Sequence, residues 1–280
     1  FEKERGVILE EKRLQQTAAG RMREKYMPTL YNYSRYADRL PIGLDDVIEH
    51  ADISLIRDFY KRWYRPDLQA LIVVGDIDVD QVESQIITLF SDLKAEKKGY
   101  ERKKYTIPLI DSTRFVASKD KEFSNINIDI VFKRKATKVI DKASFKAALV
   151  ADLANSLMAS RIQEMMRQGS KSFTGLTMGA SAFIADLTSF NVRVSLSPDK
   201  IQEGFIAAWT EVERINRYGF TPEEMKDVKE RLVARINMQE KEKDKISSSS
   251  LMEDYLNYFL SGDTYLSIDQ KIKLTREALS

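Results

Sequence analysis

The sequence has 280 residues, which favours two domains at roughly 150 residues each. Its 45 Lys and Arg nearly balance 43 Asp and Glu, so the net charge of +2 gives no reason to expect nucleic acid or an anionic membrane as a partner. No apolar run approaches the roughly 18 residues of a membrane span. The chain has no cysteine and one histidine, which excludes disulfides, thiolate nucleophiles and any two-histidine metal site built from this chain alone.

The N-terminal third carries helix signals around one apolar strand. We expect a loop from Tyr31 to Gly43, and a strand, LQALIVV, that is apolar on both faces and therefore central in a sheet. Asp78, three residues before Gln81, has the spacing of a helix cap. The predicted helices run from Glu2 to about Tyr26 with Pro28 as the stop, from Ile53 to Tyr64, and from Asp78 to Leu93, and the strand covers Leu68 to Val74.

The segment from Lys94 to Tyr105 (KAEKKGYERKKY) changes composition abruptly. A basic patch for nucleic acid and a solvated linker are both compatible with it, and the near-neutral chain favours the linker. The chain begins at Phe1 without a signal-like segment, and we expect it to be a piece of a longer protein.

The remaining residues predict strands followed by helices. Alternation indicates a half-buried strand at Ile126–Phe132, and Thr221, Pro222 and Glu224 give three agreeing signals for a helix start. The other predicted elements are a strand at Thr113–Ser118, a helix from Asp141 to about Gln168, a hairpin of Phe173–Phe183 with Asn191–Leu196, a helix from Pro198 to Tyr218, and a helix at Leu251–Leu260 after a possible break at Ser247–Ser250.

Glu11 is the most informative residue of the chain. Its helix neighbours three and four positions away include no basic residue, and Glu4 lies two turns earlier on the same side. Two carboxylates on an apolar helix face are costly unless a charge meets them. A Lys or Arg from another element and a metal or catalytic site are both compatible with this pattern. The neighbours of Glu11 are Val7, Ile8, Leu14 and Gln15.

Several segments, in order, resemble the pitrilysin/insulinase family of metallopeptidases (M16). The match is strong over the first 95 residues and later rests mainly on the order of elements. The matching segments are Glu4–Glu11 (ERGVILEE), Arg35–Gly43 (RYADRLPIG), Phe59–Leu68 (FYKRWYRPDL), Val73–Asp78 (VVGDID) and, weakly, Gly219–Glu224 (GFTPEE).

The resemblance implies roles for both glutamates. In this family two His of an inverted HxxEH helix and a Glu from a later helix hold zinc, and the Glu of HxxEH is the general base for water. By motif position the later Glu is Glu11, and Glu4 matches an acidic residue that supports the site. The chain has no HxxEH, and His50 stands elsewhere, where we expect it to be structurally neutral. The missing segment is expected upstream, so zinc is expected in the parent protein and absent from this fragment.

The resemblance also implies the fold: α+β, with layered α/β repeats in which helices pack on one face of a mostly antiparallel sheet (M16 metallopeptidase-like, LuxS/MPP-like). Residues 1–95 would be the C-terminal part of the first repeat, carrying Glu4 and Glu11. Residues 96–280 would be the second repeat, truncated at its C-terminal end. Two such halves would close around a peptide.

The expected function is part of a zinc-dependent endopeptidase that hydrolyses peptides or proteins, with this chain supplying one ligand and chamber wall and inactive by itself. Its partners would be the substrate, the HxxEH segment and a second M16 half. The alternative is a non-catalytic M16-like subunit that binds peptides or scaffolds an assembly, and the retention of Glu4 and Glu11 favours the peptidase. A free-standing adaptor domain would leave these glutamates unexplained. The compartment stays open, since a bacterial periplasm or cytoplasm both suit a chain without cysteine.

Overall fold

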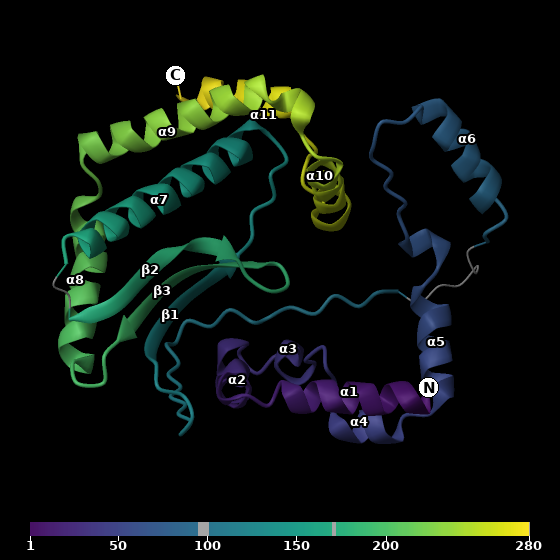
Figure 1. Ribbon diagram of the computed structural model, residues 1–280, viewed down its shortest axis with the longest axis horizontal. Coiled ribbons are helices and arrows are strands. Elements are labelled where there is room, and N and C mark those ends of the chain that lie inside the picture. The colour runs from purple at the N-terminus through teal and green to yellow at the C-terminus, as the bar shows by residue number, and fades with distance from the viewer. Residues whose placement is uncertain (95–100, 170–171, 280) are drawn as a thin grey trace. The chain divides into compact units, whose positions relative to one another are not determined.

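The computed structural model describes residues 1–94, 101–169 and 172–279 (Figure 1). The chain divides into two compact units, Phe1–Ser124 and Asn125–Ser280, called here the N-terminal and C-terminal units. The repeat boundary expected at residues 95 and 96 remains a prediction. Most of the predicted linker, residues 95–100, lies outside the described part of the chain.

The N-terminal unit is helical in its described residues. Two of the predicted helix starts are confirmed: the Asp52 carboxylate accepts from the Ser54 backbone N–H at 2.8 Å, and Asp78 accepts from Gln81 at 2.9 Å. The elements are α1 (Glu2–Leu14), α2 (Ala18–Leu30), α3 (Arg35–Asp38), α4 (Asp45–His50), α5 (Ile53–Trp63), the 3-10 turn η1 (Pro66–Leu68) and α6 (Val79–Phe90).

The single helix predicted from Glu2 to Tyr26 is wrong, because the chain breaks between α1 and α2. Thr17 caps α2 by accepting from the Gly20 backbone N–H at 3.2 Å. A Cβ at Gly20 would collide with the carbonyl oxygen of Gln15, so this turn requires glycine. The helix also passes through Pro28, since a proline in the last turn removes only one hydrogen bond. The predicted loop from Tyr31 to Gly43 contains the short helix α3.

Two predicted strands, Leu68–Val74 and Thr113–Ser118, do not form. A strand needs neighbours that satisfy its N–H and C=O groups and cover its side chains. Within the described residues no strand pairs with either segment. Leu71 is 58% exposed, although its sequence context is that of a central strand. The prediction of a central strand covered on both faces is therefore wrong for the described residues.

The C-terminal unit combines one antiparallel sheet with helices, which confirms the predicted α+β class (Figure 1). The sheet has the strand order β1-β3-β2, and the predicted hairpin is the β2–β3 pair. The elements are β1 (Ile126–Lys135), α7 (Lys142–Arg167), β2 (Phe173–Ala182), β3 (Leu187–Leu196), α8 (Ile201–Tyr218), α9 (Pro222–Lys241), the 3-10 turn η2 (Lys243–Lys245), α10 (Ser248–Ser261) and α11 (Ile268–Leu279).

The main core lies between the sheet and helices α7 and α8. Val194 is fully buried in the central strand and is paired with Ile128 of β1 and Leu176 of β2. Helix α8 approaches closely at Gly204, where a Cβ would lie 2.6 Å from Leu196 Cδ2. The alternation predicted for β1 thus places its isoleucines on the core face.

A smaller core joins α9 and α11 to α7. It contains Leu232, Ile236 and Ile272, with Leu149 and Leu153 of α7 packed against them. The capping box predicted for α9 is confirmed, with Thr221 Oγ1 accepting from the Glu224 N–H at 3.2 Å and the Glu224 carboxylate accepting from the Thr221 N–H at 2.7 Å. In the parts of the chain that the structure describes, no helix has both the length and the apolarity to cross a bilayer.

Candidate functional site

Glu4 and Glu11 lie on the same side of α1, as their spacing of seven residues predicts. Both side chains are exposed, and so are the neighbouring Val7 and Leu14. The helix face that carries the two carboxylates is therefore apolar but open. The free-energy cost of placing these two carboxylates on an apolar helix face is small here, because water reaches both of them.

Helix α4 lies along α1 (Figure 1), and basic residues of α1 contact it. Arg5 Nη2 donates to the Ala51 carbonyl oxygen at 2.9 Å, and its Nε pairs with Glu2 at 3.1 Å. Lys12 Nζ pairs with Asp45 at 2.8 Å. Arg5 and Lys12, which follow Glu4 and Glu11 in the sequence, are thus engaged with other acceptors.

The Glu11 carboxylate accepts a long hydrogen bond, at 3.3 Å, from Gln15 Nε2. Among residues 1–94, 101–169 and 172–279, no Lys, Arg or His forms an ion pair with Glu11 or Glu4. The explanation in which a base from another element meets these carboxylates therefore has no support in this part of the chain. His50 is the last residue of α4 and is exposed. Its Nδ1 lies 3.2 Å from the Asp46 carboxylate, and among the described residues its hydrogen bonds and ion pairs do not include Glu4 or Glu11.

A free carboxylate such as Glu11 suits one position of a zinc site, since Glu oxygen is an ordinary zinc ligand. A stable site needs three protein ligands or more. No group of three or more His, Cys, Asp or Glu that could hold a metal occurs among the described residues. The described part of this chain therefore fits zinc only as the source of one ligand, and the remaining ligands of the site would have to come from elsewhere.

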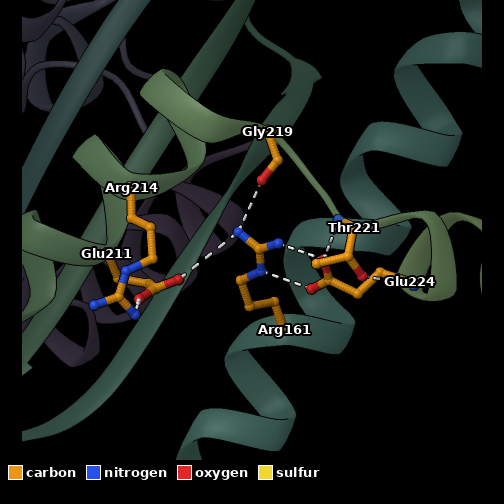
Figure 2. A network of polar contacts seen from close by, with 6 residues as sticks. All are labelled: Arg161, Glu211, Arg214, Gly219, Thr221 and Glu224. Atoms are coloured by element: carbon orange, nitrogen blue, oxygen red, sulfur yellow. Dashed lines mark hydrogen bonds and ion pairs between the residues drawn. The ribbon is translucent and has the colours of Figure 1, made fainter.

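The C-terminal unit holds a second set of charged residues, in which Arg161 of α7 lies between two glutamates (Figure 2). Arg161 Nε donates to Glu224 Oε1 at 2.6 Å, its Nη2 also bonds the Glu224 carboxylate, and its Nη1 donates to the Gly219 carbonyl oxygen at 3.0 Å. Glu211 of α8 lies 3.9 Å from Arg161 and pairs with Arg214 at 2.9 Å. We call Arg161, Glu211, Arg214 and Glu224 the ionic cluster.

The ionic cluster is satisfied by its own members. The hydrogen bonds from Arg161 lower the pKa of the Glu224 carboxyl, and the Glu224 carboxylate raises the pKa of the Arg161 guanidinium. Glu211 is only 6% exposed, so removal of these partners would leave a buried carboxyl group without a counter-charge. Sequence reasoning identified Glu224 as part of a helix cap and missed its second partner. The cluster ties α7, α8 and α9 together.

The comparisons with known proteins agree on one family. The sequence model of the peptidase M16 inactive domain matches residues 52–232, a range that begins after Glu4 and Glu11. The chain is 33% identical over 227 residues to the probable zinc protease PqqL of Escherichia coli. This alignment covers 81% of this chain and 24% of that protein. It is 24% identical over 280 residues to the zinc protease PQQL-like of Arabidopsis thaliana, covering 100% of this chain and 26% of that protein.

A solved structure extends this agreement to the fold. The crystal structure of the first half of the periplasmic protease PqqL from Escherichia coli matches with a TM-score of 0.88 and 29% identity, over 99% of this chain and 59% of that one. The chain spans about a quarter of the length of the curated relatives it matches. The resemblance seen in the sequence segments is confirmed, and this chain belongs to the M16 peptidase family.

Proposed function

We propose that this chain is part of a zinc-dependent M16 endopeptidase, which hydrolyses peptide bonds in peptides or proteins, and that it supplies Glu11 as one zinc ligand together with part of the chamber wall. The names of its relatives, which are zinc proteases, support the reaction class. The observation that carries the proposal is the state of Glu11: it is exposed and unpaired with any base in the described residues, while Arg5 and Lys12 on the same helix are engaged.

Each residue has a limited role in this chemistry. Zinc, when bound, would supply the Lewis acid that polarises the scissile carbonyl and lowers the pKa of water. Glu11 would be one of the residues that hold the metal. Glu4, two turns away on the same side of α1, adds negative charge that supports the site.

The exposed apolar surfaces of the N-terminal unit support a longer parent. Helix α5 leaves Phe59 57% exposed, and the unpaired apolar segment at residues 69–74 has no strand beside it in the described residues. Apolar surface of this kind is normally covered by protein. We infer that an upstream segment carrying HxxEH covers part of it and that a second M16 half completes the chamber.

The 280-residue chain by itself is then expected neither to cleave peptides nor to hold zinc tightly, because one carboxylate does not replace three protein ligands. Elemental analysis after dialysis against a weak chelator measures this. Stoichiometric retained zinc would contradict the proposed division of the site between this chain and an upstream segment.

The reaction is tested on the longer parent protein. Purified parent should contain about one zinc per active site and cleave unfolded protein or long peptides. A strong chelator should abolish cleavage, and added zinc should restore it. Cleavage that persists without metal would reject a zinc-dependent mechanism.

A non-catalytic M16-like subunit remains the second candidate. It is favoured by the match of residues 52–232 to a domain described as inactive. Such a subunit would bind peptides or scaffold an assembly, and its parent would contain no zinc and no HxxEH. Zinc content of the parent therefore separates the two functions.

A further inference from the structure

Helix α1 carries two parallel rows of charged residues, each with a spacing of seven. Glu4 and Glu11 form the acidic row. Arg5 and Lys12 form the basic row, which is turned from the acidic one by about 100° around the helix axis. The acidic row is exposed, whereas the side chains of Arg5 and Lys12 are only 14% and 16% exposed. The basic row thus lies on a packed side of α1, and its contacts restrict the direction in which the acidic row points.

Arg5 contacts the C-terminal end of α4. Its Nη1 donates to the Ile48 carbonyl oxygen, and its Nη2 donates to the Ala51 carbonyl oxygen at 2.9 Å. The last carbonyls of a helix have no partner within the helix, and a basic side chain can supply one. Asp52, the next residue, caps α5, so this end of α4 is tied to the following helix.

Lys12 contacts the opposite end of α4. Its Nζ pairs with the Asp45 carboxylate at 2.8 Å and donates to the Gly43 carbonyl oxygen at 3.1 Å. Asp45 is the first residue of α4, and Gly43 lies in the turn before it with a φ of +85°, which favours glycine. The basic row of α1 therefore contacts both ends of α4, and the two helices run antiparallel (Figure 1).

Two contacts at this separation constrain α1 in two ways. Arg5 and Lys12 are two turns apart, about 10 Å along the axis. Together they oppose both rotation of α1 about its axis and sliding of α1 along α4. A rotation of about 20° would move a side-chain end that lies about 6 Å from the axis by about 2 Å. That displacement is as large as a zinc–oxygen bond length, so the rotation of α1 matters for any metal bound at Glu11.

We propose that Arg5 and Lys12 are positioning residues, which hold α1 against α4 and thereby fix the direction of Glu11 toward zinc. The inference rests on the proposed function of Glu11 as a ligand. Protonated lysine and arginine have no acceptor lone pair, so they can hold the helix without competing for the metal. A ligand held by a fixed support binds its metal more tightly than a ligand on a mobile element.

The affinity of the longer parent protein for zinc tests this role. Lys12→Met removes the donor to Asp45 and Gly43 and keeps a side chain of similar shape. The zinc dissociation constant, measured by competition with a chelator of known affinity, should rise by about tenfold or more, as is typical when support of a ligand is lost. Lys12→Arg keeps a cationic donor and should restore most of the affinity.

A cobalt-substituted parent separates positioning from a general loss of stability. The visible absorption of bound Co²⁺ reports the geometry of its ligands, so Lys12→Met should change the spectrum and Lys12→Arg should return it toward the wild type. Arg13→Met is the matched control, because Arg13 is 69% exposed and pairs with Glu10 on the surface. It should leave the zinc affinity and the cobalt spectrum unchanged.

The outcomes separate this inference from the proposed function. If the wild-type parent holds zinc and Lys12→Met keeps the wild-type affinity and spectrum, the positioning role is overturned and Glu11 can still be a ligand. If the wild-type parent holds no zinc, the proposed function is rejected, and the positioning role with it.

Hydrogen exchange in the 280-residue chain keeps the inference testable if Lys12→Met does not fold in the parent. Amide hydrogens of α1 should exchange several-fold faster in Lys12→Met than in the wild type, because the helix loses one of its contacts with α4. Arg13→Met should exchange at the wild-type rate. Equal rates in Lys12→Met and Arg13→Met would show that Lys12 does not hold α1 and would overturn the proposal.

Discussion

Helix α1 and the junction of α7, α8 and α9 both carry glutamates next to apolar side chains, but the two sets of glutamates differ in their hydrogen-bond partners and in their exposure. At the junction, Glu224 receives two hydrogen bonds from Arg161, and the buried Glu211 is paired with Arg214 (Figure 2). On α1, Glu11 is exposed, and within the part of the chain that the structure describes it accepts a long hydrogen bond from Gln15 and forms no ion pair.

This difference in pairing distinguishes carboxylates that stabilise the fold from carboxylates that are available to bind a metal or a ligand. A buried ion pair is costly to break because the remaining partner is left desolvated. An exposed carboxylate without a partner contributes little to folding and can accept a metal or a ligand at no structural cost. The comparison therefore predicts large stability effects at the junction and small ones at Glu11.

The largest effect on stability is expected from Arg161→Met, which removes the shared partner of Glu211 and Glu224. Arg161 is 16% exposed, so the two glutamates would lose a mostly buried counter-charge, and the free energy of unfolding should fall by about 3–5 kcal/mol. Urea denaturation measures it. Arg167→Met on the same helix is the control, since Arg167 is 70% exposed and should matter little. Equal effects would mean that the cluster is not a structural unit.

A smaller, pH-dependent effect is expected from Glu224→Gln. The pKa of Glu224 is lowered in the folded chain by its hydrogen bonds with Arg161, so the ionised group stabilises the fold above its unfolded pKa. This contribution is lost as pH falls through the lower, folded pKa. The stability difference between wild type and variant should thus be full at neutral pH and shrink below about pH 4. A difference that stays constant down to pH 3 would contradict the assigned ionisation.

Thr221→Ala tests the helix start beside the same cluster. The Thr221 hydroxyl caps α9 by accepting from the Glu224 N–H, and removing such a cap costs about 1 kcal/mol. Thr210→Ala is a suitable control, because the Thr210 hydroxyl only donates to the Ile206 carbonyl within α8. A loss at Thr221 no greater than at Thr210 would show that the cap is not needed.

The smallest effect is expected from Glu11→Leu in the 280-residue chain. Because Glu11 is exposed and has no ion pair in the described residues, the urea midpoint should stay within error of the wild type. Glu10→Leu provides the contrast, since Glu10 pairs with Arg13 on the surface. A clear drop for Glu11→Leu alone would identify Glu11 as a structural residue and weaken its assignment to zinc.

The parts of the fold that depend on local sequence could be predicted, and the parts that depend on distant partners could not. The caps at Asp78, Asp141 and Thr221 follow from spacings of three residues, and all are present. The strand at Leu68–Val74 was wrong because strand formation requires neighbours that this segment does not find in the described residues. The break at Thr17 had a local signal, Thr followed three residues later by Gly20, which was missed.

The candidate site shows the same division. The shared side of Glu4 and Glu11 follows from helix geometry and is present in the structure. The engagement of Lys12 by Asp45 could not be read from the sequence, because the partner comes from another helix 33 residues later. The pairing of Arg161 with Glu224 is likewise non-local. The roles of Glu11 as a zinc ligand and of Glu4 as its support remain predictions carried by the family resemblance.

The most direct test of the central claim is the zinc content of the longer parent protein carrying Glu11→Gln, compared with Glu10→Gln. The amide is nearly isosteric but is a poor, uncharged ligand. We expect Glu11→Gln to lose bound zinc and peptidase activity while circular dichroism and the urea midpoint stay unchanged, and Glu10→Gln to retain both zinc and activity. Full zinc occupancy and turnover in Glu11→Gln would contradict the account, because Glu11 would then not be a ligand.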